Sequence, residues 1–151
     1  MADRSSGMHL WLVLMKAHRT LVRHAERSIV ELDMCLSDFA ILELLLHKGP
    51  EKPGDIGRRI DLTSGAITTA VDRLESRRMV TRTFDAADRR ARVVSLTPWG
   101  RTLIESVFAA HTAAMERATG NLTATEQAKL TQLLKKLGTN AERQLTEEIA
   151  G

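Results

Sequence analysis

The spacing of hydrophobic side chains predicts that most of this chain is helical. Near the N-terminus, apolar and histidine positions recur at alternating intervals of four and three residues, which indicates one long helix with a heptad-type stripe. Ser5 or Ser6 can cap the start of that helix. The stripe consists of Trp11, Met15, His18, Val22, Ala25, Ile29 and Leu32.

Two further helices are predicted near the C-terminus. The first begins at Thr97-Pro98, with threonine as N-cap and proline at the first helical position. The second begins after Thr123-Ala124-Thr125-Glu126, which has the pattern of a capping box. Their stripes consist of Ile104, Phe108, His111, Met115 and Ala118, and of Leu130, Leu134, Leu137, Ala141, Leu145 and Ile149.

The centre of the chain predicts three shorter helices. One has Ser37 as its N-cap and ends at Gly49-Pro50, and a short one follows Pro53 and covers residues 55–60. The third runs from Ser64 to near Arg78. It presents one apolar face, formed by Ile67, Ala70, Val71 and Leu74.

After this helix, the pattern of hydrophobic and polar residues changes from the period of a helix to that of a β-strand. Val80–Phe84 and Arg92–Leu96 are rich in β-branched residues, and the polar loop 85–91 joins them, so we expect a β-hairpin. The fold class is therefore mainly α with a small β-hairpin wing, which is the layout of a winged helix-turn-helix. We expect one domain over residues 1–151, with a DNA-binding lobe at 36–97.

The terminal helices, over residues 8–34 and 98–149, carry more apolar surface than such a lobe can cover. Heptad-type stripes at both ends of a chain are typical of helices that pack against a second subunit, so we expect a homodimer. The alternative is a helical bundle within one chain.

Charge is unevenly distributed. The chain has 22 basic and 19 acidic residues, a net charge of +3, and the excess lies entirely within residues 51–100. The segment from Arg73 to Arg92 alone has seven basic and three acidic side chains. A local excess of this kind is typical of a surface that binds a polyanion. The alternative is a solvated cluster of charges.

The third central helix carries the residue types of a DNA-reading helix. Small residues let the backbone approach the floor of the major groove, and hydroxyl groups bind base edges or phosphates. Arg73 and Arg77, further along the helix, suit phosphate contacts. The predicted groove-reading residues are Ser64, Gly65, Ala66, Thr68 and Thr69.

The hairpin tip carries a second cluster, Asp88, Arg89, Arg90 and Arg92. An arginine on such a wing can enter the minor groove, where the negative potential attracts a guanidinium. We expect Asp88 to pair with Arg90 and fix its direction. A surface ion pair without function is the alternative.

These segments resemble the MarR (multiple antibiotic resistance regulator) family. The matching stretches are LSDFAILELLLHKGP from Leu36, LTSGAITTAVDRLESRRMV from Leu62 and DAADRRARVVSLTPWG from Asp85. With the flanking helices, the resemblance covers about residues 8–149. It implies a homodimeric regulator, most simply a repressor, that binds a pseudo-palindromic double-stranded DNA operator. It also places Ser64, Thr68 and Thr69 in the groove, Arg73 on phosphate, and Asp88 and Arg90 on the wing.

One position departs from the family pattern. Many members have glycine where this chain has Arg78, at a helix end where the left-handed conformation costs other residues about 1 kcal/mol. The sequence therefore does not predict the backbone conformation with which the chain enters the hairpin.

The family commonly responds to small aromatic or phenolic ligands. Trp11, Met15, His18 and Phe39 are the candidates for such an effector pocket, although each also suits a core or dimer contact. A thiol-based response through Cys35 is the alternative, because a thiol near a helix N-terminus can be reactive. A helical protein–protein interaction module without a DNA role is the rival from another class.

Other classes are disfavoured. The chain has no H-E-x-x-H, phosphate-loop or G-x-S-x-G motif, so we expect no enzyme. We expect no cofactor and no metal site, because the histidines lack a tight metal-ligand spacing; the alternative is a metal bound by His and carboxylate side chains from different helices. No apolar run reaches about 20 residues and no signal peptide is evident, so we expect a cytoplasmic protein with no membrane partner.

Overall fold

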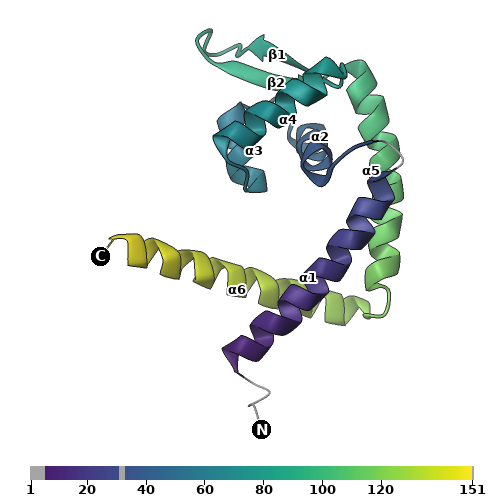
Figure 1. The fold of residues 1–151 in the computed structure, drawn as a ribbon, viewed down its shortest axis with the longest axis vertical. Coiled ribbons are helices and arrows are strands. Elements are labelled where there is room, and N and C mark those ends of the chain that lie inside the picture. Colours follow the sequence, from purple (N-terminus) through teal and green to yellow (C-terminus); the bar gives the residue numbers. More distant parts are fainter. Residues whose placement is uncertain (1–5, 31–32, 151) are drawn as a thin grey trace. The chain divides into compact units, whose positions relative to one another are not determined.

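The computed structural model describes residues 6–30 and 33–150, and it confirms the predicted order of elements (Figure 1). Ser5 and Leu32, which the sequence assigned to the first helix, lie outside the described residues. The elements are α1 (Gly7–Ile29), α2 (Leu36–Lys48), α3 (Pro53–Ile60), α4 (Ser64–Ser76), β1 (Val80–Phe84), β2 (Arg92–Leu96), α5 (Pro98–Thr119) and α6 (Ala124–Ala150).

The chain forms two compact units, residues 1–115 and 116–151, and helix α5 contributes to both. The first unit holds the core, to which α2, α4 and the hairpin contribute most of the buried side chains. The predicted apolar face of α4 is fully buried in that core. Its members are Ile67, Ala70, Val71 and Leu74.

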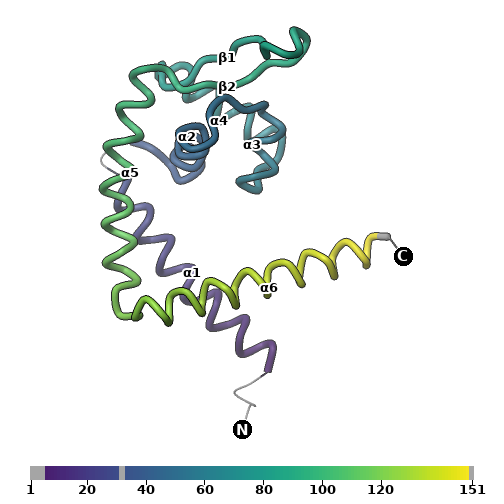
Figure 2. Tube along the Cα trace, turned by 180° about the vertical axis from the view of Figure 1, so that it is seen from behind, coloured from purple at the N-terminus to yellow at the C-terminus, as the bar shows by residue number. Residues whose placement is uncertain are grey.

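The hairpin has the predicted strands in antiparallel register, with Val80 opposite Leu96 and Phe84 opposite Arg92. Glu51, which precedes α3, extends it on the other side of β2. Its N–H donates to the Val94 carbonyl at 3.1 Å, and the Val94 N–H donates to the Glu51 carbonyl at 2.8 Å. The wing is thus hydrogen-bonded to the α2–α3 connection. Figure 2 shows β1 and β2 side by side as a hairpin.

Several predicted helix ends are confirmed. Ser6 accepts a hydrogen bond from the His9 N–H, and Gly49 ends α2 with a φ of 81°. The Thr97 hydroxyl accepts from the Gly100 N–H at 2.9 Å. Thr123 and Glu126 form the reciprocal bonds of a capping box. Local sequence signals were sufficient at these ends because a cap involves residues only three positions apart.

The predicted start of α2 was wrong. Cys35, not Ser37, is the N-cap, with an extended backbone and no capping hydrogen bond to its side chain. The Cys35 carbonyl already accepts from the Phe39 N–H at 3.1 Å. The helix therefore begins one residue before Ser37, and Asp38 lies in its first turn.

Arg78 adopts the left-handed conformation itself, with a φ of 58°. Its N–H donates to the Glu75 carbonyl, and the Met79 N–H donates to the Leu74 carbonyl, each at 2.9 Å. This is the bonding of a left-handed helix end, formed without glycine. The chain consequently enters the hairpin in the usual way, and the backbone of Arg78 carries the strain.

Candidate nucleic-acid interface

The first half of α4 presents the predicted groove-reading residues to solvent. Ser64, Gly65, Ala66, Thr68 and Thr69 are all exposed. The Thr68 hydroxyl donates to the Ser64 carbonyl at 2.9 Å, and the Thr69 hydroxyl donates to the Gly65 carbonyl at 3.0 Å. Because each hydroxyl hydrogen is used within the helix, its oxygen faces outward as an acceptor. These two threonines therefore suit the exocyclic amino groups of adenine or cytosine.

Arg73 is held by Asp38, a residue the sequence did not single out. The Arg73 Nε donates to Asp38 Oδ2 at 2.9 Å, and Nη2 donates to Oδ1. Asp38 is 1% exposed and is the only buried charged residue among the described residues. This hydrogen bond raises the pKa of Arg73 above its ordinary value. Two of the three guanidinium nitrogens thus face protein, and only Nη1 remains for the predicted phosphate contact.

Arg77 also turns toward the protein. Its Nη1 donates to the Asp33 carbonyl at 2.7 Å, in the connection between α1 and α2. Together with Arg73, it joins the second half of α4 to the segment that leads into α2. The predicted phosphate contacts of both residues therefore compete with bonds inside the lobe.

The wing loop is held by its own carboxylates. Asp85 Oδ1 accepts from the Ala87 N–H, and Asp88 Oδ1 accepts from the Arg90 N–H, each at 2.9 Å. The bond from Ala87 is the main cause that lowers the pKa of Asp85. The expected pairing of Asp88 with the Arg90 guanidinium was wrong. A carboxylate reaches the backbone N–H two residues ahead more directly than the end of a long side chain.

The arginine side chains of the wing are accessible from solvent. Arg89, Arg90 and Arg92 are exposed, and no ion pair in the described part of the chain joins them to a carboxylate. The Arg92 guanidinium lies over the Phe84 ring, 4.8 Å from its centroid. Such stacking limits the directions of Arg92 without neutralising it. The tip therefore presents positive charge on a loop with a fixed backbone.

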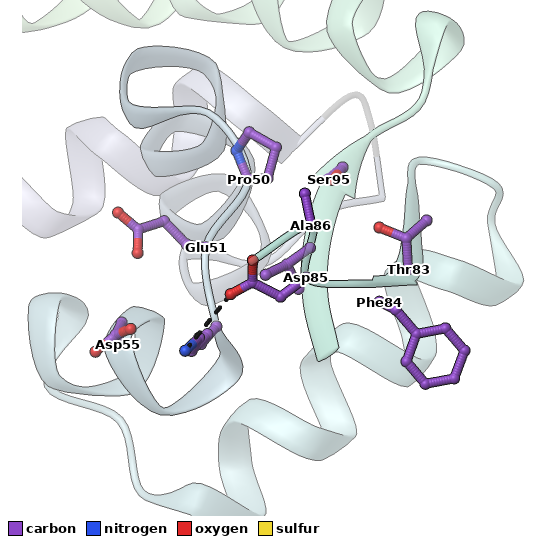
Figure 3. A pocket seen from close by; sticks show the side chains of 10 residues that line it. Pro50, Glu51, Asp55, Thr83, Phe84, Asp85, Ala86 and Ser95 are labelled. Atoms are coloured by element: carbon purple, nitrogen blue, oxygen red, sulfur yellow. Dashed lines mark ion pairs between the residues drawn. The ribbon is translucent and has the colours of Figure 1, made fainter. Parts of the chain in front are cut away.

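A pocket of about 400 Å³ lies where the wing meets the start of α3 (Figure 3). Lys52 spans it, with its Nζ 3.5 Å from Asp85 Oδ2. Glu51 and Asp55 add two further carboxylates to the lining. Both of these carboxylates are paired with arginines, Glu51 with Arg59 and Asp55 with Arg58. The Lys52–Asp85 pair ties the wing loop to the start of α3.

The four candidate effector residues do not form one pocket within the chain. Phe39 is buried, and its ring lies 4.5 Å from that of His111. His111 Nδ1 lies 2.8 Å from the Ser28 hydroxyl, so this contact is at the C-terminal end of α1. Trp11 is 54% exposed near the other end of the helix. At 1.5 Å per residue, Trp11 and Ser28 lie roughly 25 Å apart along α1. Met15 and His18 lie between them.

Cys35 is exposed, and its Sγ lies 3.3 Å from Arg73 Nη2. Within residues 6–30 and 33–150, no group of three His, Cys, Asp or Glu side chains can hold a metal ion. Over the same ranges, no helix is both long and apolar enough to cross a membrane.

Comparisons with known proteins agree with this geometry. Residues 35–91 match the model of the MarR family. The chain is 34% identical to the HTH-type transcriptional regulator MhqR of Bacillus subtilis, over 91% of this chain and 94% of MhqR. A MarR mutant from E. coli complexed with operator DNA superposes with a TM-score of 0.77 and 27% identity, over 85% of this chain and 92% of that one. BpsR of Bordetella bronchiseptica superposes with a TM-score of 0.78 and 24% identity, over 91% and 96%.

Proposed function

The chain belongs to the MarR family of DNA-binding transcriptional regulators, a family without enzymatic activity, and we propose that it acts as a homodimeric repressor. In this proposal α4 enters the major groove of a pseudo-palindromic operator, and the wing contacts the adjacent minor groove. The observation that supports this proposal is that two exposed elements lie in the same unit. One is the start of α4, which presents hydroxyl acceptors, and the other is the wing tip, whose arginines form no ion pair within the described residues.

The chemistry of the two elements is complementary. The Thr68 and Thr69 oxygens offer acceptors to base edges, which provides sequence discrimination. Arg89 and Arg90 offer positive charge to phosphates and to the narrow minor groove, which provides affinity and register. A reading element and an electrostatic element on one lobe are what a sequence-specific DNA-binding protein requires.

Exposed apolar side chains support the homodimer. On α1, Met8, Trp11 and Leu12 are each more than half exposed. On α6, Leu133, Leu145 and Ile149 are exposed as well. Exposed apolar surface on this scale is typical of an interaction site, and helices from both chain ends provide it. A pseudo-palindromic operator has two half-sites, so the partner expected on this surface is a second copy of the chain.

We further propose that a small aromatic or phenolic ligand releases the repressor. The solved protein BpsR, whose DNA binding is regulated by 6-hydroxynicotinic acid, has the same fold and so shows that this fold permits control by such a molecule. Binding would change the distance between the two recognition helices, which must fit successive major grooves about 34 Å apart.

Fluorescence anisotropy tests the proposed DNA binding by measuring the affinity of the protein for the DNA upstream of its own gene. We expect operator affinity to fall steeply with salt and Arg90→Ala to weaken it by about 1–3 kcal/mol while the dimer persists. The matched control is Arg143→Ala on α6. A flat salt response together with an unchanged Arg90→Ala affinity would instead favour a helical module that binds an acidic protein.

A further inference from the structure

We propose that Arg82 is a positioning residue: held by Asp72 and Glu75 of α4, it fixes the angle between the recognition helix and the wing and so sets operator affinity without touching DNA. This inference rests on the proposed DNA-binding role of α4 and the wing. The residues concerned form a cluster that is distinct from the reading face and from the wing tip.

Three bonds join β1 to α4 at this point. The two terminal nitrogens of Arg82 bind different carboxylates, Nη1 that of Glu75 and Nη2 that of Asp72. The backbone N–H of Arg82 also donates to Glu75 Oε1 at 3.1 Å. Glu75 therefore holds both the main chain and the side chain of Arg82. An ordinary surface ion pair, with one contact between two flexible ends, does not constrain a strand in this way.

The burial of Arg82 agrees with a structural connection to α4. Its side chain is 21% exposed, against 61% for Asp72 and 41% for Glu75. Partial burial lowers the pKa of Arg82, but the hydrogen bonds that the guanidinium donates to the two carboxylates outweigh it and raise that pKa. The arginine remains charged under all ordinary conditions. Although it belongs to the basic segment, it faces protein and not solvent.

The position of Arg82 gives it control of the wing tip. It lies in the middle of β1, opposite Val94, while the predicted DNA-contacting arginines lie beyond the end of the strand. With about 3.3 Å per strand residue, the tip is on the order of 20 Å from the hairpin base. A rotation of about 10° at the base would then move the tip by about 3 Å. A binding group must be placed within roughly 0.5 Å, so the wing needs such a constraint.

The carboxylates themselves point to the same role. Asp72 is exposed one turn after Thr68 and Thr69, on a helix that the proposed function places against DNA. An unpaired carboxylate there would repel phosphates. Arg82 offsets one of the two negative charges and holds both carboxylates in ion pairs, so the repulsion of phosphates by Asp72 and Glu75 is weakest while the arginine is present.

A double-mutant cycle tests the proposal, because two residues that act through one element show non-additive effects. Operator affinity is measured for the parent protein, Arg82→Met, Arg90→Ala and the double variant. We expect each single variant to bind about 10-fold more weakly, and Arg90→Ala to cost only about 2-fold in the Arg82→Met background. Affinity for unrelated DNA should fall much less in Arg82→Met, because that binding needs no fixed wing and is weakened only by the carboxylates that Arg82 no longer holds.

Two variants serve as controls. Arg143→Met removes an exposed arginine that pairs with Glu147 one turn away on α6, and it should leave the cost of Arg90→Ala unchanged. Arg82→Lys keeps the charge but can reach one carboxylate at a time, so partial recovery is expected. Helix content by circular dichroism identifies any variant that fails to fold, and Arg82→Lys then replaces Arg82→Met in the cycle.

The outcomes separate the two proposals. If Arg90→Ala weakens binding equally in both backgrounds, Arg82 does not position the wing and the inference is wrong. If Arg90→Ala has no effect in the parent protein, the wing part of the proposed function fails. In that case the ratio of operator to unrelated DNA affinity in Arg82→Met still decides: an unchanged ratio overturns the positioning role, and a lowered ratio supports it.

Discussion

The basic segment from Arg73 to Arg92 contains two sets of arginines that the structure uses in opposite ways. Arg73 and Arg82 each bind a carboxylate from another element, Asp38 on α2 and the pair Asp72 and Glu75 on α4. Arg89 and Arg90 lie exposed on the wing loop, where Asp85 and Asp88 bind backbone N–H groups instead. The net charge of a segment therefore overstates the charge available to DNA.

The difference depends on where the acidic groups lie. A carboxylate on a neighbouring helix approaches an arginine side chain from a fixed direction, and the pair joins two elements. A carboxylate within a short loop reaches the loop's own N–H groups first. The first arrangement stabilises the lobe, and the second shapes the loop while its arginines stay available to DNA.

The largest effect is expected at the inward set. Asp38→Asn removes the negative charge opposite Arg73 and should lower the free energy of unfolding by about 2 kcal/mol. Loss of a fully buried pair costs more, but Arg73 is partly exposed and water screens its charge. Urea denaturation measures the change. The control Glu147→Gln breaks the exposed pair with Arg143 and should cost less than about 0.5 kcal/mol. Equal losses for the two variants would show that Asp38 is no more than a surface partner.

The second prediction concerns salt. Each phosphate contact adds about one unit to the slope of log affinity against log salt concentration. Arg89→Ala and Arg90→Ala should therefore each reduce the slope by about one, measured by anisotropy between 50 and 200 mM salt. Arg82→Met should also reduce the slope, because a displaced wing loses its phosphate contacts, and Arg90→Ala should then reduce it little further. If the slope losses of Arg82→Met and Arg90→Ala add, Arg82 contacts phosphate itself, and the distinction between the two sets would fail.

The third prediction uses an arginine that belongs to neither set. Arg78 has a left-handed backbone, and glycine there relieves the strain at some cost in chain entropy. Arg78→Gly should raise the free energy of unfolding by about 0.5–1 kcal/mol, measured by thermal or urea unfolding. Arg78→Ala removes the same charge but keeps the strained Cβ, so it should give no such gain. If both variants stabilise the protein equally, charge repulsion and not backbone strain is the cause.

The smallest effect is expected from His111, a partly buried titratable group near the junction of α1, α2 and α5. Desolvation lowers the pKa of His111 below its ordinary value of 6.5, although the charge of Glu43 opposes this. The unfolded chain then binds the proton more readily than the folded one, so stability should fall as the pH drops below about 6.5. His111→Gln should reduce the loss between pH 7.5 and 5.5 in urea unfolding. Exposed His24→Gln is the control, and equal pH dependence in the two variants would contradict the prediction.

Much of the fold could be predicted because its signals are local. The strands Val80–Phe84 and Arg92–Leu96 have the predicted bounds. The cap at Thr97 was identified from the proline that follows it, and the cap at Thr123 from Glu126 three positions later. The buried face of α4 followed from helical periodicity alone. The start of α2 was misplaced because cysteine is a rare N-cap, and the serine two residues later has the more usual pattern.

The sequence by itself determined which segments are helices or strands, which face of α4 is buried and which segment is basic, since periodicity, capping and composition act within a few residues. Only the tertiary structure decided which charges meet. Asp38 and Arg73 are 35 positions apart, and Arg82 meets α4 only because the hairpin folds back beside it. Ion-pair energies depend on distance and burial between elements, and packing, which no local pattern encodes, sets both.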